Sequence, residues 1–178
     1  MSVGIFAQNP SIIPIPSKAG YAKGAYALNK SIIIAGPKNE ALASTYANLT
    51  DKLTRIAGKK VQWLYDQSSV ASLAAIRFKL NTNPDATLGN EGYQLVSDAK
   101  GVQITANKPA GLFYGIQTLL QLLPKEIESS QDVSGVNWKV PYAQITDNPR
   151  FAWRGQMFDV ARHFFTKEEV KQFIDDMV

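Results

Sequence analysis

His163, the only histidine of the chain, is the first residue to test for catalytic or metal chemistry. Asp159 stands four residues before it, so the two side chains could serve as a pair of metal ligands. A zinc site needs three or four ligands, and the sequence has no H-E-x-x-H motif. A Ser-His-Asp triad is also unsupported, because no G-x-S-x-G turn is present. We therefore expect no metal and no cofactor, and we interpret His163 as a packing or hydrogen-bonding side chain.

Two acidic pairs, Glu168–Glu169 and Asp175–Asp176, have the residue types that general acid–base catalysis uses. Both pairs fall on the polar face of a short amphipathic segment, where solvated charge is the ordinary explanation. Arg162, taken by itself, is most simply explained by an ion pair with a nearby carboxylate. The residue types alone therefore assign no reaction.

The elements that would position these side chains are a strand and a helix at the C-terminal end. Arg154–Val160 has the pattern of a strand, and Thr166 to Glu169 fits the capping box S/T-x-x-E/Q. The helix that begins there has one apolar face, made by Val170, Phe173, Ile174 and Met177. A strand followed at once by a helix is the repeat unit of a parallel α/β architecture. We expect 149–178 to be the first βα unit of a (β/α)8 barrel, which needs ~250 residues in all and is truncated here.

Residues 11–148 have the pattern of one complete α+β domain. Apolar residues at steps of three and four predict a helix from Asn39 to Ile56, capped by Gly58, and a second helix from Pro109 until Pro124. Strands are expected at Tyr26–Ala35, Val61–Tyr65, Ala75–Leu80 and Val140–Asp147, with a hairpin over Gly92–Ser97 and Val102–Thr105. Ile12–Pro16 suits an edge strand or an extended lead-in. This order predicts a mainly antiparallel sheet with helices on one face.

Composition excludes several classes of protein. The formal net charge is +4, but no run of basic residues could follow a phosphate backbone, so no nucleic-acid partner is expected. There is no cysteine to form disulfides or thiolate sites. No segment reaches the ~18 apolar residues of a membrane helix, so we expect no membrane span.

The first residues, Met1 to Gln8, resemble the tail of a signal peptide, with small Ala7 ahead of a polar stretch. They lack the basic start and full apolar region of a complete signal. Residues 1–10 are therefore interpreted equally well as a signal-peptide remnant or as a disordered start. The first interpretation would place the protein in the periplasm or outside the cell.

Two stretches resemble glycoside hydrolase family 20 β-N-acetylhexosaminidases. Residues 109–124, PAGLFYGIQTLLQLLP, are similar to the last helix of the family's small α+β domain. Residues 147–165 resemble the start of its catalytic barrel, with the pattern R-G-x-(M/L)-x-D-x-(A/S)-R-(H/x)-F from Arg154 to Phe164. Together with Ile12–Pro16, the resemblance covers essentially the whole chain.

The resemblance implies a retaining mechanism in which the 2-acetamido oxygen of the substrate attacks the anomeric carbon. An adjacent Asp-Glu pair on a later barrel strand assists this attack in the family, and no such pair in a matching context follows Asp159 before Val178. Arg162 matches the family arginine at the end of the first barrel strand, so the resemblance implies that it binds hydroxyls of the terminal sugar. Asp159 would either hold Arg162 or accept bonds from backbone N–H groups at the strand end.

We therefore expect a non-catalytic fragment of an enzyme that removes terminal N-acetylglucosamine or N-acetylgalactosamine from glycans. The chain alone is expected to be inactive, with no catalytic residue of its own. The alternative is a self-contained, non-enzymatic module that binds glycans or acts as a scaffold. In either case the apolar helix face in 149–178 lacks a sheet to cover it, so these residues are expected to dock on the first domain or to associate with a second copy.

Overall fold

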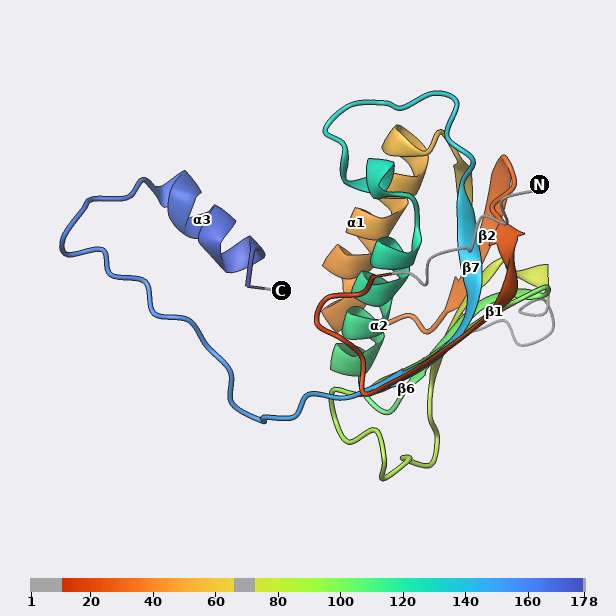
Figure 1. Ribbon diagram of the computed structural model, residues 1–178, viewed down its shortest axis with the longest axis horizontal. Coiled ribbons are helices and arrows are strands. Elements are labelled where there is room, and N and C mark those ends of the chain that lie inside the picture. The colour runs from red at the N-terminus through yellow and green to blue at the C-terminus, as the bar shows by residue number, and fades with distance from the viewer. Residues whose placement is uncertain (1–10, 66–72, 178) are drawn as a thin grey trace, which may run out of the picture. The chain divides into compact units, whose positions relative to one another are not determined.

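A computed structural model of the chain describes residues 11–65 and 73–177 (Figure 1). The chain divides into two compact units, Met1–Asn148 and Pro149–Val178. The predicted signal-peptide remnant at 1–10 lies outside the described residues. The first unit is a mixed α/β fold built on one sheet.

The sheet of the first unit has seven strands in the order β1-β7-β5-β6-β4-β2-β3. Their bounds are β1 Lys18–Ala27, β2 Ser31–Gly36, β3 Lys60–Tyr65, β4 Ile76–Leu80, β5 Tyr93–Asp98, β6 Gly101–Ala106 and β7 Lys139–Asp147. The β1/β7, β7/β5 and β5/β6 pairs are antiparallel, whereas β6/β4, β4/β2 and β2/β3 are parallel. The prediction of a mainly antiparallel sheet is therefore wrong.

The parallel β2/β3 pair follows from a helical crossover. A helix between two strands carries the chain back along the sheet, so the second strand runs in the same direction as the first. The first helix connects β2 to β3 in this way, and α2 connects β6 to β7, which lie on either side of β5. The predicted β5/β6 hairpin is confirmed. Gly101 has a φ of 123° in its turn, and Asp98 Oδ1 accepts a bond from the Lys100 N–H at 2.7 Å.

Both predicted helices of the first unit are present. A 3₁₀ turn (Glu40–Leu42), α1 (Ala43–Asp51) and a π-helical turn (Lys52–Ile56) form one continuous helical segment, and Gly58 follows at φ 61° as the capping pattern predicts. α2 spans Pro109–Leu122. Figure 1 shows α1 and α2 on the same side of the sheet. Among the described residues, no helix is long and apolar enough to cross a membrane.

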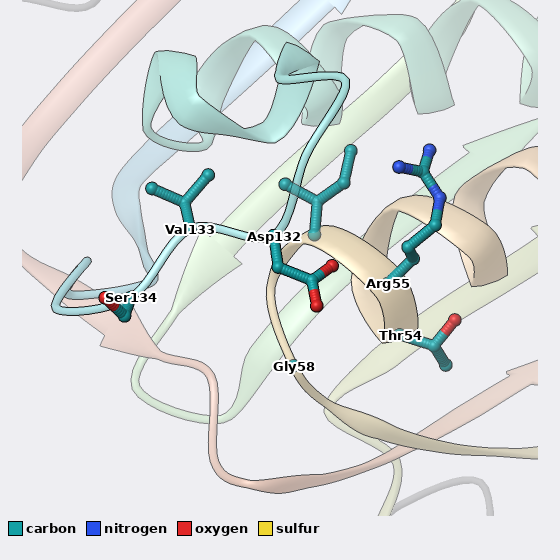
Figure 2. A pocket seen from close by; sticks show the side chains of 7 residues that line it. Thr54, Arg55, Gly58, Asp132, Val133 and Ser134 are labelled. Carbon is teal, nitrogen blue, oxygen red and sulfur yellow. The ribbon is translucent and has the colours of Figure 1, made fainter.

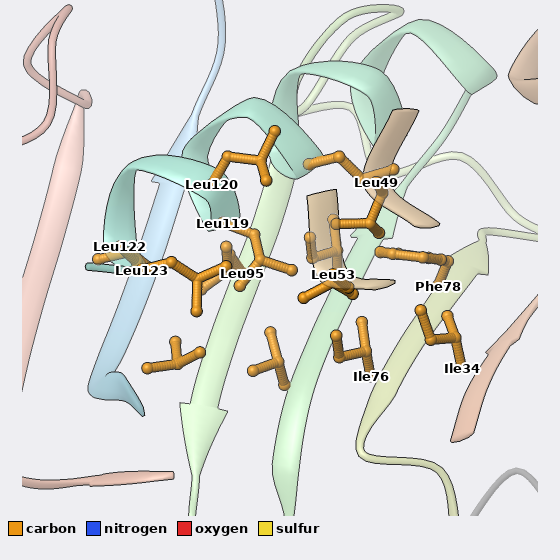
Figure 3. Packing of buried hydrophobic residues seen from close by; sticks show 14 of the residues in the cluster. Ile34, Leu49, Leu53, Ile76, Phe78, Leu95, Leu119, Leu120, Leu122 and Leu123 are labelled. Carbon is orange, nitrogen blue, oxygen red and sulfur yellow. The ribbon is translucent and has the colours of Figure 1, made fainter. Parts of the chain in front are cut away.

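The core lies between these helices and the sheet. Its fully buried side chains alternate along β5 and β6 and recur at helical spacing in α1 and α2, as Figure 3 shows for Leu49, Leu53, Leu95 and Leu119. Tyr93 is also buried there, and its hydroxyl contacts the Thr118 hydroxyl at 2.5 Å. Burial raises the pKa of Tyr93 to about 12, partly offset by the Thr118 bond, so the phenol stays protonated near neutral pH.

One predicted strand needs correction, and of the two alternatives for Ile12–Pro16 the lead-in is present. Tyr26–Ala35 is not one strand, because Leu28 to Lys30 separate β1 from β2. The Leu28 N–H instead donates to the Trp138 carbonyl at 2.9 Å, and this bond belongs to no strand ladder. Ile12–Pro16 is an extended lead-in rather than an edge strand, held where Gln121 both accepts from the Ile13 N–H and donates to its carbonyl, each at 2.8 Å.

The second unit contains α3, Lys167–Asp175, which begins at the predicted capping box. The Thr166 hydroxyl accepts from the Glu169 N–H, and the Glu169 carboxylate accepts from the Thr166 N–H at 2.7 Å. These bonds hold the pKa of Glu169 below its usual value. The predicted strand Arg154–Val160 is wrong for this structure, because those residues form no strand. A strand needs a neighbour for its N–H and C=O groups, and the described part of this unit supplies no second strand.

Candidate functional site

The residues that the sequence singled out lie in the loop that connects Phe158 to Phe165. The Asp159 carboxylate accepts a bond from the Ala161 N–H at 2.9 Å through Oδ1 and contacts Arg162 Nε at 3.4 Å through Oδ2. The structure therefore brings Asp159 and Arg162 together, and the same carboxylate accepts from one backbone N–H, although no strand ends there. Arg162 keeps 87% of its side chain exposed, so most of its guanidinium donors face solvent.

Three phenylalanines shape this loop. The Phe158 ring stacks on Phe173 of α3 at 4.4 Å between centroids and packs on Phe165 at 4.6 Å. These contacts bring the two ends of the loop together on the helix, because Phe158 and Phe165 bracket it in the sequence. The segment 159–164 is thus a closed loop on an aromatic base, with Arg162 projecting from it.

His163 lies in the same loop but is exposed and hydrogen-bonds to no described residue. The expected packing or hydrogen-bonding role is therefore not seen in this structure. Within 11–65 and 73–177, no three His, Asp or Glu side chains are grouped as a metal ion would require.

Large apolar side chains around the loop are exposed. Trp153 is 91% exposed and Met157 is 89% exposed, and Phe164 is fully exposed. Exposed apolar groups of this size are typical of surfaces that another part of a protein covers. This surface has the character that the expected docking or self-association requires.

Two hollows are lined by described residues of the first unit, and neither was predicted. The smaller, about 300 Å³, lies between the end of the α1 segment and the loop at 132–134 (Figure 2). Its Arg55 is already engaged, because the guanidinium binds Asp51 at 2.9 Å and the Ser130 carbonyl at 3.0 Å. Figure 2 shows the Arg55 guanidinium directed away from Gly58. The larger hollow, about 620 Å³, lies beside β3 and contains Trp63 and Tyr65.

The alternation of Trp63 and Tyr65 was a visible signal for the larger hollow. Two aromatic residues two positions apart on a strand point to the same side. Aromatic residues on a strand ordinarily belong to a core, so these two were not predicted as a surface feature.

Residues 9–148 match glycosyl hydrolase family 20, domain 2, and residues 151–178 match the glycosyl hydrolase family 20 catalytic domain. The chain belongs to glycoside hydrolase family 20.

Its relatives are hexosaminidases. A β-hexosaminidase of Porphyromonas gingivalis is 38% identical over 94% of this chain and 21% of its own length. A β-N-acetylhexosaminidase of Cellulomonas fimi is 30% identical over 92% of this chain and 31% of its own length. The chain thus spans between a fifth and a third of these relatives.

Solved structures show the same fold. The N-acetyl-β-hexosaminidase of Streptomyces plicatus, in complex with Thio-NAglucal, matches 93% of this chain at a TM-score of 0.79 and 36% identity. The family 20 β-N-acetylhexosaminidase of Streptomyces coelicolor matches 93% at a TM-score of 0.80 and 36% identity. In both cases the chain covers about a third of the solved protein, 31% and 32%.

Proposed function

We propose that this chain forms the accessory domain and the beginning of the catalytic barrel of a retaining β-N-acetylhexosaminidase. The observation that carries the proposal is the succession of two family 20 matches, at 9–148 and 151–178, within one chain. The enzyme would release terminal N-acetylglucosamine or N-acetylgalactosamine from glycans. An N-acetylhexosamine-containing glycan is therefore the partner of the complete enzyme.

The chemistry would be divided between this chain and the rest of the barrel. In the substrate-assisted scheme, the acetamido oxygen of the sugar is the nucleophile, so the protein supplies no covalent nucleophile. Arg162 would donate hydrogen bonds to hydroxyls of the terminal sugar, and its exposed guanidinium has donors free for this. Asp159 would orient Arg162, because its carboxylate is itself fixed by the Ala161 N–H. The acid–base carboxylates would come from later strands.

Hydrolysis tests this proposal. The 178-residue chain should not cleave a chromogenic N-acetyl-β-glucosaminide, whereas the protein extended by ~300 residues, enough for the rest of a barrel and its loops, should cleave it. Cleavage by the short chain would contradict the division of labour. Activity in neither form would favour the alternative of a non-enzymatic module that binds glycans.

The exposed apolar surface at Trp153, Met157 and Phe164 supports a second expectation. In the 178-residue chain this surface should drive self-association or docking on the first unit. Sedimentation over a hundredfold range of concentration should show dimers that a Trp153→Ser, Phe164→Ser variant loses, or a monomer in which both side chains are protected from solvent. A monomer with both side chains freely accessible would contradict the expectation.

We also propose that the enzyme acts in the periplasm or outside the cell, from the resemblance of Met1 to Gln8 to the tail of a signal peptide. Fractionation of the producing cells should then place the full-length protein outside the cytoplasm. Recovery with cytoplasmic markers would contradict this location.

A further inference from the structure

The larger hollow of the first unit is a groove between the edge strand β3 and the outer side of the α1 segment. It is open to solvent and has a volume of about 620 Å³. Six of its residues carry the argument: Lys38, Glu40, Tyr46, Asp51, Trp63 and Tyr65. We call it the β3 groove.

Aromatic rings form one wall of the β3 groove. Trp63 and Tyr65 project from the same side of β3, and their rings are nearly parallel, 8° apart, with centroids at 5.7 Å. Tyr65 is 43% exposed although it stands beside a folded core. Trp63 is half-buried, so the pair offers the Tyr65 ring and the uncovered part of the Trp63 ring to a ligand that packs on ring faces.

Neighbouring side chains fix the orientation of the Trp63 ring. Tyr46 of α1 packs on Trp63 at 4.4 Å, and Phe78 lies 6.0 Å from the same indole. The indole Nε1–H donates to the Thr50 hydroxyl at 2.9 Å, which fixes the rotation of the ring. A ligand would therefore meet a surface that needs little ordering on binding, which favours affinity.

Polar groups of both kinds border the wall. Lys38 and Glu40 flank the start of the α1 segment, and both are exposed, with side chains that form no hydrogen bond or ion pair with a described residue. They offer ammonium donors and carboxylate acceptors. Asp51 is engaged by Arg55, which keeps the pKa of Asp51 below its usual value and its carboxylate charged.

The charges decide between classes of ligand. Lys38 and Glu40 are opposite charges in the lining, and Asp51 is paired with Arg55, so the groove carries no excess of positive charge. Nucleic-acid bases also stack on aromatic rings, but their phosphates require a positively charged groove. A phosphate-bearing or acidic ligand is therefore disfavoured. A pyranose ring fits both features, because its C–H face packs on aromatic rings and its hydroxyls both donate and accept hydrogen bonds.

We propose that the β3 groove binds a neutral oligosaccharide, with C–H contacts to Trp63 and Tyr65 and hydroxyl bonds to Lys38 and Glu40. The proposal goes beyond the hydrolytic function, since it rests on the groove alone and assigns sugar binding to the first unit. An open groove of this kind predicts weak binding, with a Kd on the order of 1 mM.

Nuclear magnetic resonance of the ¹⁵N-labelled 178-residue chain tests the proposal through its three indole N–H signals, from Trp63, Trp138 and Trp153. Titration with tetra-N-acetylchitotetraose, and separately with cellotetraose, should shift the Trp63 signal and leave that of buried Trp138 in place. Tyr65→Ala should weaken binding about tenfold. Glu40→Gln should weaken it less, because an amide still accepts and donates hydrogen bonds.

Phe151→Ala is the matched control, because Phe151 is an aromatic residue that is 71% exposed and lies outside the groove. Binding should be unchanged in this variant. The proposal is overturned if neither sugar shifts Trp63 at 20-fold the expected Kd, if the shifts follow Trp153, or if a thymidine oligomer binds the groove in place of the sugars. Hydrolysis plays no part in this readout, so the outcome is separate from that of the hydrolytic test.

Discussion

Replacing Gly111 with alanine is expected to lower the free energy of unfolding by about 2–3 kcal/mol, the cost of overpacking a core. Helix propensity alone predicts a rise in the free energy of unfolding, because alanine in a helix is favoured over glycine by roughly 0.5–1 kcal/mol. Packing decides here, since a Cβ on Gly111 would overlap the Gly92 carbonyl oxygen and approach Ala106 Cβ to 2.8 Å. The first of these neighbours is backbone, so α2 or the start of β5 would have to move.

Urea unfolding followed by circular dichroism measures this effect. Gly115→Ala, one turn later, is the graded comparison, because its nearest neighbours are the Ile104 side chain at 2.5 Å and the Tyr93 ring at 3.2 Å. Side chains can move aside more readily than backbone, so the loss should be smaller than at Gly111. Ala47→Gly on the exposed side of α1 should cost only the propensity term, roughly 0.5–1 kcal/mol. A Gly111→Ala protein as stable as the parent would show that α2 does not lie this close to β5.

The position of α2 was predictable from sequence in one respect and not in another. Leu112 and Leu119 recur at helical spacing, and this predicted both the helix and its buried face, which the structure confirms. The reason for glycine at 111 is the approach of Gly92, nineteen residues earlier in the chain. Local periodicity carries no information on such a contact.

The sheet shows the same division between local and distant information. The β5/β6 hairpin was predicted because its turn and both strands are contiguous in sequence. The parallel β2/β4 and β4/β6 pairs join strands that are distant in sequence. The alternation of apolar and polar residues along a strand does not predict whether its neighbour runs parallel or antiparallel to it.

The candidate sites show the same difference between local patterns and contacts of distant residues. The capping box at Thr166 is a pattern of four residues, and it is present as predicted. The β3 groove needs Lys38, Tyr46 and Trp63 to meet across the gap between a strand and a helix. Arg154–Val160 is the reverse case, because its strand pattern is clear but a strand also requires a partner.

In the extended, active protein, Arg162→Ala is expected to raise KM about 100-fold while changing the stability of the fold little. Hydrogen bonds from a charged donor contribute roughly 1.5–3 kcal/mol, and 2.8 kcal/mol corresponds to about two decades. The effect should fall mainly on KM, because contacts to hydroxyls away from the reacting bond bind ground state and transition state alike. Arg162→Lys should recover little, since an ammonium cannot give the paired bonds of a guanidinium.

Steady-state kinetics with the chromogenic substrate checks this, and Arg150→Ala is the control, because Arg150 is exposed in the same unit but lies outside the loop. Asp159→Asn separates positioning from charge. The amide oxygen can still accept from the Ala161 N–H, so the loop should keep its shape, while the ionic contact with Arg162 is lost. A positioning role predicts a rise in KM of about tenfold, the lower limit for lost supporting contacts around a site. If Arg162→Ala matched Arg150→Ala in both KM and kcat, the guanidinium would have no role at the sugar, and its contact with Asp159 would be only an exposed ion pair.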